Sequence, residues 1–335
     1  MNRRERVFRA IEHRDTDIVP YDIDFTVPAR EKMIDYYGDA DFEEKIGNHL
    51  ARIEAVPSDG WIETEPDIWR DEFGVVWNRS IDKDIGTPEL PPMIPEPTLD
   101  GYTFPDPYLK SRYAGHTEFI ASYPDRFRIN DIGFTLFERA WTLRGMESFL
   151  TDMIVNPDFT NELLDKLVEF NVGIVDGAAK FDFDGIMFGD DWGQQRGLIM
   201  GPDLWRKYFK PRIAEMYKAA HDRDLAVFIH SCGDIKAVLP DLIEVGVDVL
   251  NPFQPEVMDP YETKKTFGDR ISFYGGMSTQ KTLPYASVDQ VKAETKKLLK
   301  HVGRSGGFIF SPAHQTPGDV PAENMAAMIE VLMGQ

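Results

Sequence analysis

The chain alternates short apolar runs with segments whose apolar residues recur at helical spacing. Each run is β-branched or aromatic and ends in polar, glycine or proline residues, which is the pattern of a buried strand. Strands that alternate with helices indicate parallel βαβ units, and eight of them in one chain predict an α/β fold of the (β/α)8 (TIM) barrel type. A doubly wound sheet is the rival fold, but no glycine fingerprint follows the first run. The eight runs are IVPYDI (18–23), ARIEAV (51–56), FRINDIG (127–133), DGIMFGD (184–190), LAVFIHS (225–231), VDVLNP (247–252), ISFYGG (271–276) and GFIFSP (307–312).

Helices are predicted over 202–223, over 234–246 with a glycine stop, and over 287–307 from a serine N-cap to a closing glycine. Residues 57–110 depart from the alternation, because they contain DEFGVVWNRS and then the proline-rich TPELPPMIPEPT. We expect this segment to be an insertion with a small hairpin that lies on the barrel and helps to cover its site. The whole chain, 1–335, is then one domain.

Composition narrows the range of functions. The 335 residues are 42% hydrophobic and 28% charged, and no apolar stretch is long enough to cross a membrane. The N-terminus reads as a charged amphipathic helix rather than a signal peptide, and a single cysteine excludes an internal disulfide framework, so a cytoplasmic location is expected. The net charge of −20 argues against nucleic acid and anionic membranes as partners.

Polar residues of the kinds used in catalysis cluster at the ends of the predicted strands. Barrel enzymes build their active sites at the carboxyl ends of the strands, so we expect these side chains to share one rim. In chain order they are Asp22, Asp24, Asn130, Asp131, Glu138, Arg139, Asp190, Asp191, Gln194, Gln195, His230, Cys232, Asn251, Gln254, Glu256, Tyr274 and His314.

The stretch FIHSCGDI (228–235) holds the only cysteine. Residues i and i+2 of an extended strand point the same way, so His230 and Cys232 are placed to share a metal ion. Zinc accepts imidazole and thiolate, and the third ligand would be His314 or Glu256. Two other interpretations stay open: a thiol nucleophile with a histidine base, and a small buried thiol beside a histidine.

The adjacent carboxylates Asp190 and Asp191 point to opposite faces if they lie on a strand. One is then expected to contact a ligand and the other to cap the loop that follows. The FGVVW stretch (73–77) is expected to serve mainly as core or lid packing.

Along nearly its whole length the sequence resembles the uroporphyrinogen decarboxylase superfamily. The resemblance implies a (β/α)8 barrel, in agreement with the strand count, and makes a homodimer an expectation. It rests on RERVFRAIEHRDTDIVP (4–20), RAWTLRGMESFLTDMIVNP (139–157), GDDWGQQRGLIMGPDLWRKYFKPR (189–212), HSCGDI (230–235), YGGMSTQKTL (274–283) and SPAHQTPGDVPAENM (311–325).

The superfamily contains two chemistries. True uroporphyrinogen decarboxylases need no cofactor and grip the carboxylates of their substrate with an arginine-rich motif after the first strand. Here that place reads YDIDFTVPAR (21–30), with aspartates where arginine is needed, and the aspartate motif expected for the pyrrole nitrogens is not recognisable in 57–90. An octacarboxylate would meet repulsion rather than bidentate arginine clamps.

The other branch contains zinc- and corrinoid-dependent methyltransferases with an H-x-C motif and a later cysteine. His230 and Cys232 match the first two ligands, and the expected later cysteine falls on His314. The resemblance implies bound Zn2+ and a corrinoid (cobalamin) that arrives on a partner protein or free, since no DxHxxG signature is present.

The sequence hypothesis is therefore a zinc-dependent methyltransferase acting on a small methylated molecule such as a methoxylated aromatic. Cofactor-free decarboxylation and non-catalytic binding of a small molecule are the alternatives. Under the first hypothesis Asp24, Glu138 or Asp190 protonates the leaving oxygen. The substrate would be bound by Asp22, Asp131, Arg139, Asp191, Gln195, Asn251, Gln254 and Tyr274.

Overall fold

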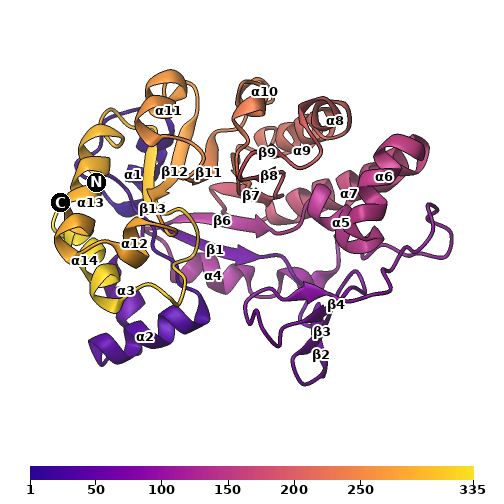
Figure 1. Cartoon of the computed structure of the whole chain (residues 1–335), viewed down its shortest axis with the longest axis horizontal. Helices are drawn as coiled ribbons and strands as arrows, with labels where there is room; N and C mark the ends of the chain where they lie inside the picture. Colours follow the sequence, from indigo (N-terminus) through magenta and orange to yellow (C-terminus); the bar gives the residue numbers. More distant parts are fainter.

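The computed structural model describes all 335 residues and is built around a curled parallel sheet (Figure 1). Its strands are hydrogen-bonded in chain order, so each βα unit lies beside the next, as in a TIM barrel. The sheet contains β1 (Leu50–Glu54), β6 (Phe127–Ile132), β7 (Gly185–Gly189), β10 (Ala226–His230), β11 (Val249–Phe253), β12 (Ser272–Met277) and β13 (Phe308–Pro312).

The first predicted strand, 18–23, is not a regular strand, and this part of the prediction is wrong. The segment nevertheless lies between β13 and β1: Tyr21 bridges Phe310, and its carbonyl accepts from His49 N at 3.0 Å. The Asn48 side chain bonds both the N–H and the C=O of Ile23, at 3.0 and 2.9 Å. On the β13 side the segment keeps backbone bonds, from Asp22 N to Phe310 O at 2.9 Å and from Phe310 N to Pro20 O at 2.8 Å. On the β1 side the Asn48 amide takes the place of a backbone ladder, so the segment fills the eighth position without forming a regular strand.

Helices cover the outside of the sheet, and the two ends of the chain lie near each other (Figure 1). The longest helix, α7, packs on α9, and α13 packs on α14. The helices are α1 (Arg3–Ile11), α2 (Val27–Tyr37), α3 (Phe42–Ile46), α4 (His116–Ser122), α5 (Phe137–Arg144), α6 (Met146–Val155), α7 (Pro157–Ala178), α8 (Pro202–Tyr208), α9 (Lys210–His221), α10 (Leu239–Glu244), α11 (Pro260–Phe267), α12 (Thr282–Tyr285), α13 (Val288–His301) and α14 (Ala322–Met333), with 3-10 turns η1 (Lys110–Tyr113) and η2 (Lys236–Val238).

Two of the three predicted helices are interrupted. The 202–223 segment divides into α8 and α9 because Pro211 has no N–H to continue the first helix, and it starts the second instead. The 234–246 segment forms η2 and then α10, where Pro240 again begins the helix. The serine cap of the third prediction is confirmed: Ser287 and Gln290 form a capping box at the start of α13, which ends at His301.

The barrel interior is closed at the amino ends of the strands. Val7 of α1 packs in one buried cluster with inward side chains of the strands, among them Leu50, Phe127, Phe228 and Ile309. Helix α1 contacts β1, β6 and β13. Ligands can therefore reach the interior only from the carboxyl ends, where the predicted site residues lie.

The 57–110 insertion forms a four-stranded antiparallel sheet rather than one hairpin. Its strands are β2 (Trp61–Glu65), β3 (Ile68–Asp71), β4 (Val76–Asn78) and β5 (Thr87–Pro88). Buried Trp77 packs on Phe134 of the barrel, with ring centroids 5.2 Å apart, and Asp71 pairs with Arg139 at 2.6 Å. A short hairpin, β8 (Gly193–Gln194) with β9 (Gly197–Leu198), follows β7.

We find no helix with the length and apolar composition that a membrane crossing requires.

Candidate metal centre and active-site cavity

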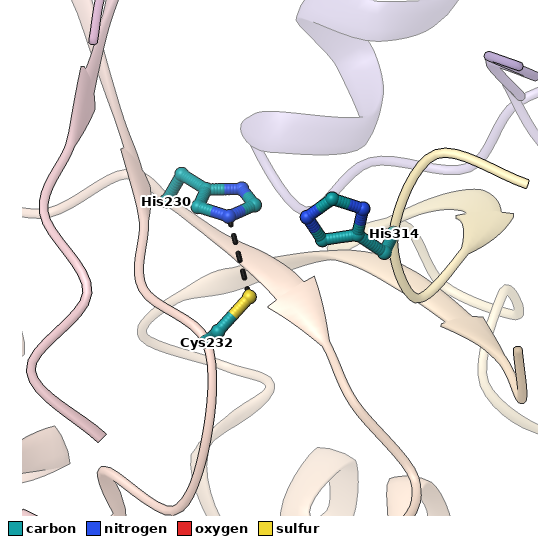
Figure 2. A group of neighbouring side chains, drawn as sticks. All are labelled: His230, Cys232 and His314. Atoms are coloured by element: carbon teal, nitrogen blue, oxygen red, sulfur yellow. Dashed lines mark hydrogen bonds between the residues drawn. The ribbon is translucent and has the colours of Figure 1, made fainter. Parts of the chain in front are cut away.

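Three potential metal ligands meet where β10 and β13 end (Figure 2). His230 is the last residue of β10, and Cys232 follows it in the next loop, with Sγ 3.4 Å from His230 Nε2. His314 arrives from the segment after β13 and turns its ring toward His230, with ring centroids 5.6 Å apart. One ligand atom from each residue lies within 4.8 Å of the other two. The structure thus brings together residues that are 84 positions apart in the sequence.

The donor set fits zinc. Zinc–sulfur and zinc–nitrogen bonds of about 2.3 and 2.0 Å in tetrahedral geometry separate two ligand atoms by roughly 3.5 Å. The separation of His230 Nε2 and Cys232 Sγ is already 3.4 Å, and His314 needs only a small side-chain movement. Three protein ligands leave the fourth position for a substrate or water, as in catalytic zinc sites.

Hydrogen bonds fix the orientation of the first two ligands. Asn251 donates from Nδ2 to the Tyr274 carbonyl at 3.1 Å, so its Oδ1 is left to accept from His230 Nδ1 at 2.6 Å. His230 Nε2 is therefore the nitrogen with the free lone pair, directed at Cys232. Asp191 Oδ1 accepts from the Cys232 backbone N–H at 2.8 Å, and Gln254 Oε1 accepts from Gly233 N at 3.1 Å. These supporting contacts are typical of metal sites.

Burial and the neighbouring Asp191 raise the pKa of the Cys232 thiol well above its ordinary value. The thiolate form therefore needs a nearby cation, which a bound metal supplies. Burial and His230 lower the pKa of His314, which keeps the imidazole neutral and able to ligate. The surroundings of Cys232 and His314 therefore suit a metal site better than a catalytic thiol that acts as a free thiolate nucleophile.

A cavity of about 570 Å³ opens beside these ligands, and His230 and His314 form part of its wall. Five of the predicted substrate-binding and catalytic residues line the same cavity: Asp22, Asp24, Asp131, Asn251 and Tyr274. Tyr274 Oη donates to Asp22 Oδ2 at 2.6 Å, and Gln315 Nε2 donates to Asp24 Oδ2 at 3.0 Å. The strand-end residues thus converge on one polar space.

Among the cavity residues that were not identified from the sequence are two charged residues of β1, Arg52 and Glu54. Arg52 donates to Asp24 Oδ2 at 2.6 Å and lies 3.7 Å from Asp131 Oδ2, and Glu54 lines the cavity near them. Both belong to β1, inside the run ARIEAV. The sequence did contain a signal for them, because both charged residues stand at alternate positions of an otherwise apolar parallel strand and therefore point to the same side.

Other predicted residues lie elsewhere. Asp190, 1% exposed, accepts from Phe137 N at 2.9 Å, Glu138 N at 2.8 Å and Trp192 Nε1 at 2.6 Å, so it anchors the start of α5. Burial and the nearby Asp191 raise the pKa of Glu138. Glu256 binds the Ser278 hydroxyl and is not one of the three converging ligands.

Arg139 and Gln195 also lie outside the large cavity. Arg139 pairs with Asp71 of the insertion, beside a separate cavity of about 80 Å³. Gln195 is exposed at the turn between β8 and β9. The insertion contributes a single residue, Ile85, to the wall of the large cavity.

A profile of the uroporphyrinogen decarboxylase (URO-D) family matches residues 133–334, which is more than half of the chain. The chain belongs to the uroporphyrinogen decarboxylase family. This matched part contains the ends of β7, β10, β11, β12 and β13, and with them all three potential metal ligands.

Family members of both chemistries are similar to this chain. A methylcobamide:CoM methyltransferase MtaA from Methanosarcina barkeri is 26% identical over 188 residues, 56% of this chain and 52% of that protein. A uroporphyrinogen decarboxylase from Chlorobium phaeovibrioides is 24% identical over 253 residues, 72% of this chain and 70% of that protein. The chain thus spans about half the length of the methyltransferase relative that it matches.

The solved structure of a methyltransferase from Methanosarcina mazei has the same fold as the present protein. The two chains superpose with a TM-score of 0.76 at 18% sequence identity, covering 100% of this chain and 99% of the other. The (β/α)8 prediction is confirmed by this likeness and by the order of the sheet.

Proposed function

We propose that the protein is a zinc-dependent methyltransferase that moves a methyl group between a small methylated molecule and a corrinoid carried by a partner protein. The observation that carries the proposal is the convergence of His230, Cys232 and His314 at the carboxyl ends of the strands, with both histidines in the wall of one cavity. The similarity to a methylcobamide:CoM methyltransferase supports the corrinoid as the second substrate.

In this proposal His230, Cys232 and His314 hold the zinc, and Asn251 and Asp191 orient the first two ligands. Zinc bound by two neutral imidazoles and one thiolate supplies Lewis acidity to a substrate oxygen, which suits a methoxylated aromatic. The remaining wall of the cavity positions the substrate, with Asp22 and Tyr274 as its polar partners.

A proton must reach the oxygen when a methoxy group loses its methyl. Of the three predicted proton donors only Asp24 lines the cavity, where Arg52 and Gln315 donate to its carboxylate. Glu138 does not line the cavity, and it is the second candidate because burial beside Asp191 favours its protonated form. Asp190 is fully engaged with backbone and indole N–H groups, so we assign it a positioning role.

The cavity is poorly suited to cofactor-free decarboxylation of a porphyrinogen. Only two arginines line it, and both are paired: Arg52 with Asp24 at 2.6 Å and Arg126 with Glu44 at 2.7 Å. A polycarboxylate would find no free guanidinium and several carboxylates. The charges of the cavity therefore favour the methyltransferase over the decarboxylase.

Zinc per chain, measured by elemental analysis, tests the proposal first. We expect about one zinc in the wild type and its loss in Cys232→Ala and in His314→Ala. His301→Ala is the matched control, because His301 is an exposed residue at the end of α13. The zinc-loaded protein should then demethylate a methoxylated aromatic with a Co(I) corrinoid as acceptor. Wild-type protein that neither retains nor takes up zinc would remove the basis of the proposal.

A further inference from the structure

Four carboxyl groups surround one guanidinium inside the large cavity. Asp22, Asp24, Glu54 and Asp131 line it together with Arg52. Arg52 Nη2 donates to Asp24 at 2.6 Å, and Nη1 lies 3.7 Å from Asp131. The only other arginine of the wall is paired with Glu44. The cavity therefore has more carboxyl groups than its own cations can neutralise.

Glu54 has no ion-pair partner, and Asp131 has only the 3.7 Å contact with Arg52. They are register partners at the ends of the neighbouring strands β1 and β6, so the two side chains lie next to each other. Glu54 is exposed to the solvent of the cavity, where limited solvation and the nearby Asp131 raise its pKa to about 7. Burial raises the pKa of Asp131 and of Asp22. Carboxylates placed this close repel one another, so a cation that binds between them would be favoured.

These carboxylates do not form a second metal site. His230, Cys232 and His314 bring one potential ligand atom each within 4.8 Å of the others, and no three of the carboxylates bring their oxygen atoms together in this way. They instead border a space of about 570 Å³, which fits an organic molecule. Phe119 and Tyr123, whose ring centroids lie 5.1 Å apart, line the same cavity. The Tyr123 ring already carries a cation, because the Arg126 guanidinium lies 4.7 Å from its centroid, so the carboxylates remain the groups that would recognise a further charge.

We infer that the methylated substrate of this cavity carries a positively charged group, apart from the methylated oxygen that a bound zinc would polarise, and that Glu54 and Asp131 recognise this charge. The inference rests on the proposed function, because it assigns the substrate class of the same cavity. It departs from the neutral methoxylated aromatic, since such a molecule would leave the surplus carboxylates uncompensated.

Binding of two molecules of equal shape tests the charge. Choline and 3,3-dimethylbutan-1-ol differ in one central atom, and only choline is cationic. By titration calorimetry with the zinc-loaded protein we expect choline to bind at least about tenfold more tightly, which corresponds to roughly 1.4 kcal/mol. Glu54→Gln keeps the side-chain shape and should remove most of this preference. Glu63→Gln, at an exposed position on β2, should preserve it.

Equal affinities for the two molecules, or a preference unchanged in Glu54→Gln, would overturn the inference. Its failure is separable from that of the proposed function. A protein that holds zinc and demethylates neutral methoxylated aromatics, but does not prefer choline, keeps the function and rejects the charged substrate. A protein that prefers choline through Glu54 but binds no zinc keeps the charge recognition and rejects the methyltransferase.

Discussion

His230 Nδ1 lies 2.6 Å from Asn251 Oδ1, and this contact decides which nitrogen of His230 faces the cysteine. The Asn251 amide is itself oriented by the carbonyl of Tyr274, 3.1 Å from its Nδ2. Strands β10, β11 and β12 therefore fix one ligand through a chain of two hydrogen bonds.

Replacing Asn251 should weaken metal binding without touching a ligand. We expect Asn251→Ala to reduce zinc affinity about 10- to 100-fold, because His230 loses the acceptor that holds its tautomer and ring orientation. Zinc affinity can be measured by competition with a chromogenic chelator. Asn171→Ala is the matched control: Asn171 is buried and donates to Thr135 O at 3.0 Å, far from any ligand in the sequence. Equal zinc affinity in Asn251→Ala and the wild type would contradict the assigned role.

The glycine after Cys232 is needed for close packing. Gly233 has φ +84°, and a Cβ there would collide with the backbone of Gly193 and Gln194 in the β8–β9 hairpin. Gly38 has φ +63°, but no atom lies within 4 Å of the position that a Cβ would take. A substitution at Gly38 therefore measures the cost of the left-handed backbone conformation alone, without a collision.

We expect Gly38→Ala to cost about 1 kcal/mol of unfolding free energy, as usual for a left-handed position. Gly233→Ala should cost clearly more and should also release zinc, because the loop that positions Cys232 must move. Denaturant titration and zinc analysis measure the two effects. Similar losses of stability in both variants, with zinc retained, would show that the hairpin yields to the new side chain.

The insertion is attached to the barrel by a buried ion pair. Arg139 Nη1 lies 2.6 Å from Asp71 Oδ2, both side chains are at most 7% exposed, and Arg139 lies 4.0 Å above the Phe73 ring. Arg139→Met should destabilise the protein by about 3–5 kcal/mol, because it leaves the Asp71 carboxylate buried without its cation.

The exposed pair between Lys83 and Asp67, 2.7 Å apart in the same insertion, gives the comparison. Lys83→Met should change the unfolding free energy by about 0.5 kcal/mol or less. Chemical denaturation of both variants provides the measurement. A cost for Arg139→Met no larger than that for Lys83→Met would mean that the insertion does not depend on this pair.

The raised pKa of Glu54 predicts a pH dependence of stability. In the folded protein it is about 7 against an ordinary 4.5, through burial and Asp131, with Glu72 adding to the rise and Arg52 and Arg139 opposing it. As pH rises from 4.5 to 7, the unfolded chain loses this proton first, so Glu54 lowers the unfolding free energy across that window.

Glu54→Gln should therefore be more stable relative to the wild type at pH 8 than at pH 5. We expect a difference of about 1 kcal/mol, reduced by the contact of this side chain with cavity solvent. Urea denaturation at the two pH values measures it. Parallel pH profiles for the two proteins would show that Glu54 ionises without cost.

The sequence by itself determined the barrel and placed His230 and Cys232 together as candidate ligands. Alternating strand and helix patterns are local, because periodicity reflects which face of each element is buried, so seven of the eight strands follow from it. The H-x-C spacing is equally local, since two residues on one extended segment point the same way. The serine cap of α13 also depends only on neighbouring residues.

Tertiary structure decided the rest. Asn251, Asp191 and Gln254 were predicted as substrate contacts, and the structure adds that they orient His230 and the Cys232 loop, because their partners come from other strands. The side chain of Asn48 completes the hydrogen bonding of 18–23, which no periodicity reveals. The close pair of carboxyl groups, Glu54 and Asp131, exists only because β1 and β6, separated by the whole insertion, lie in register. Contacts between distant segments are set by packing of the complete chain, and in this protein they determine the charge of the cavity.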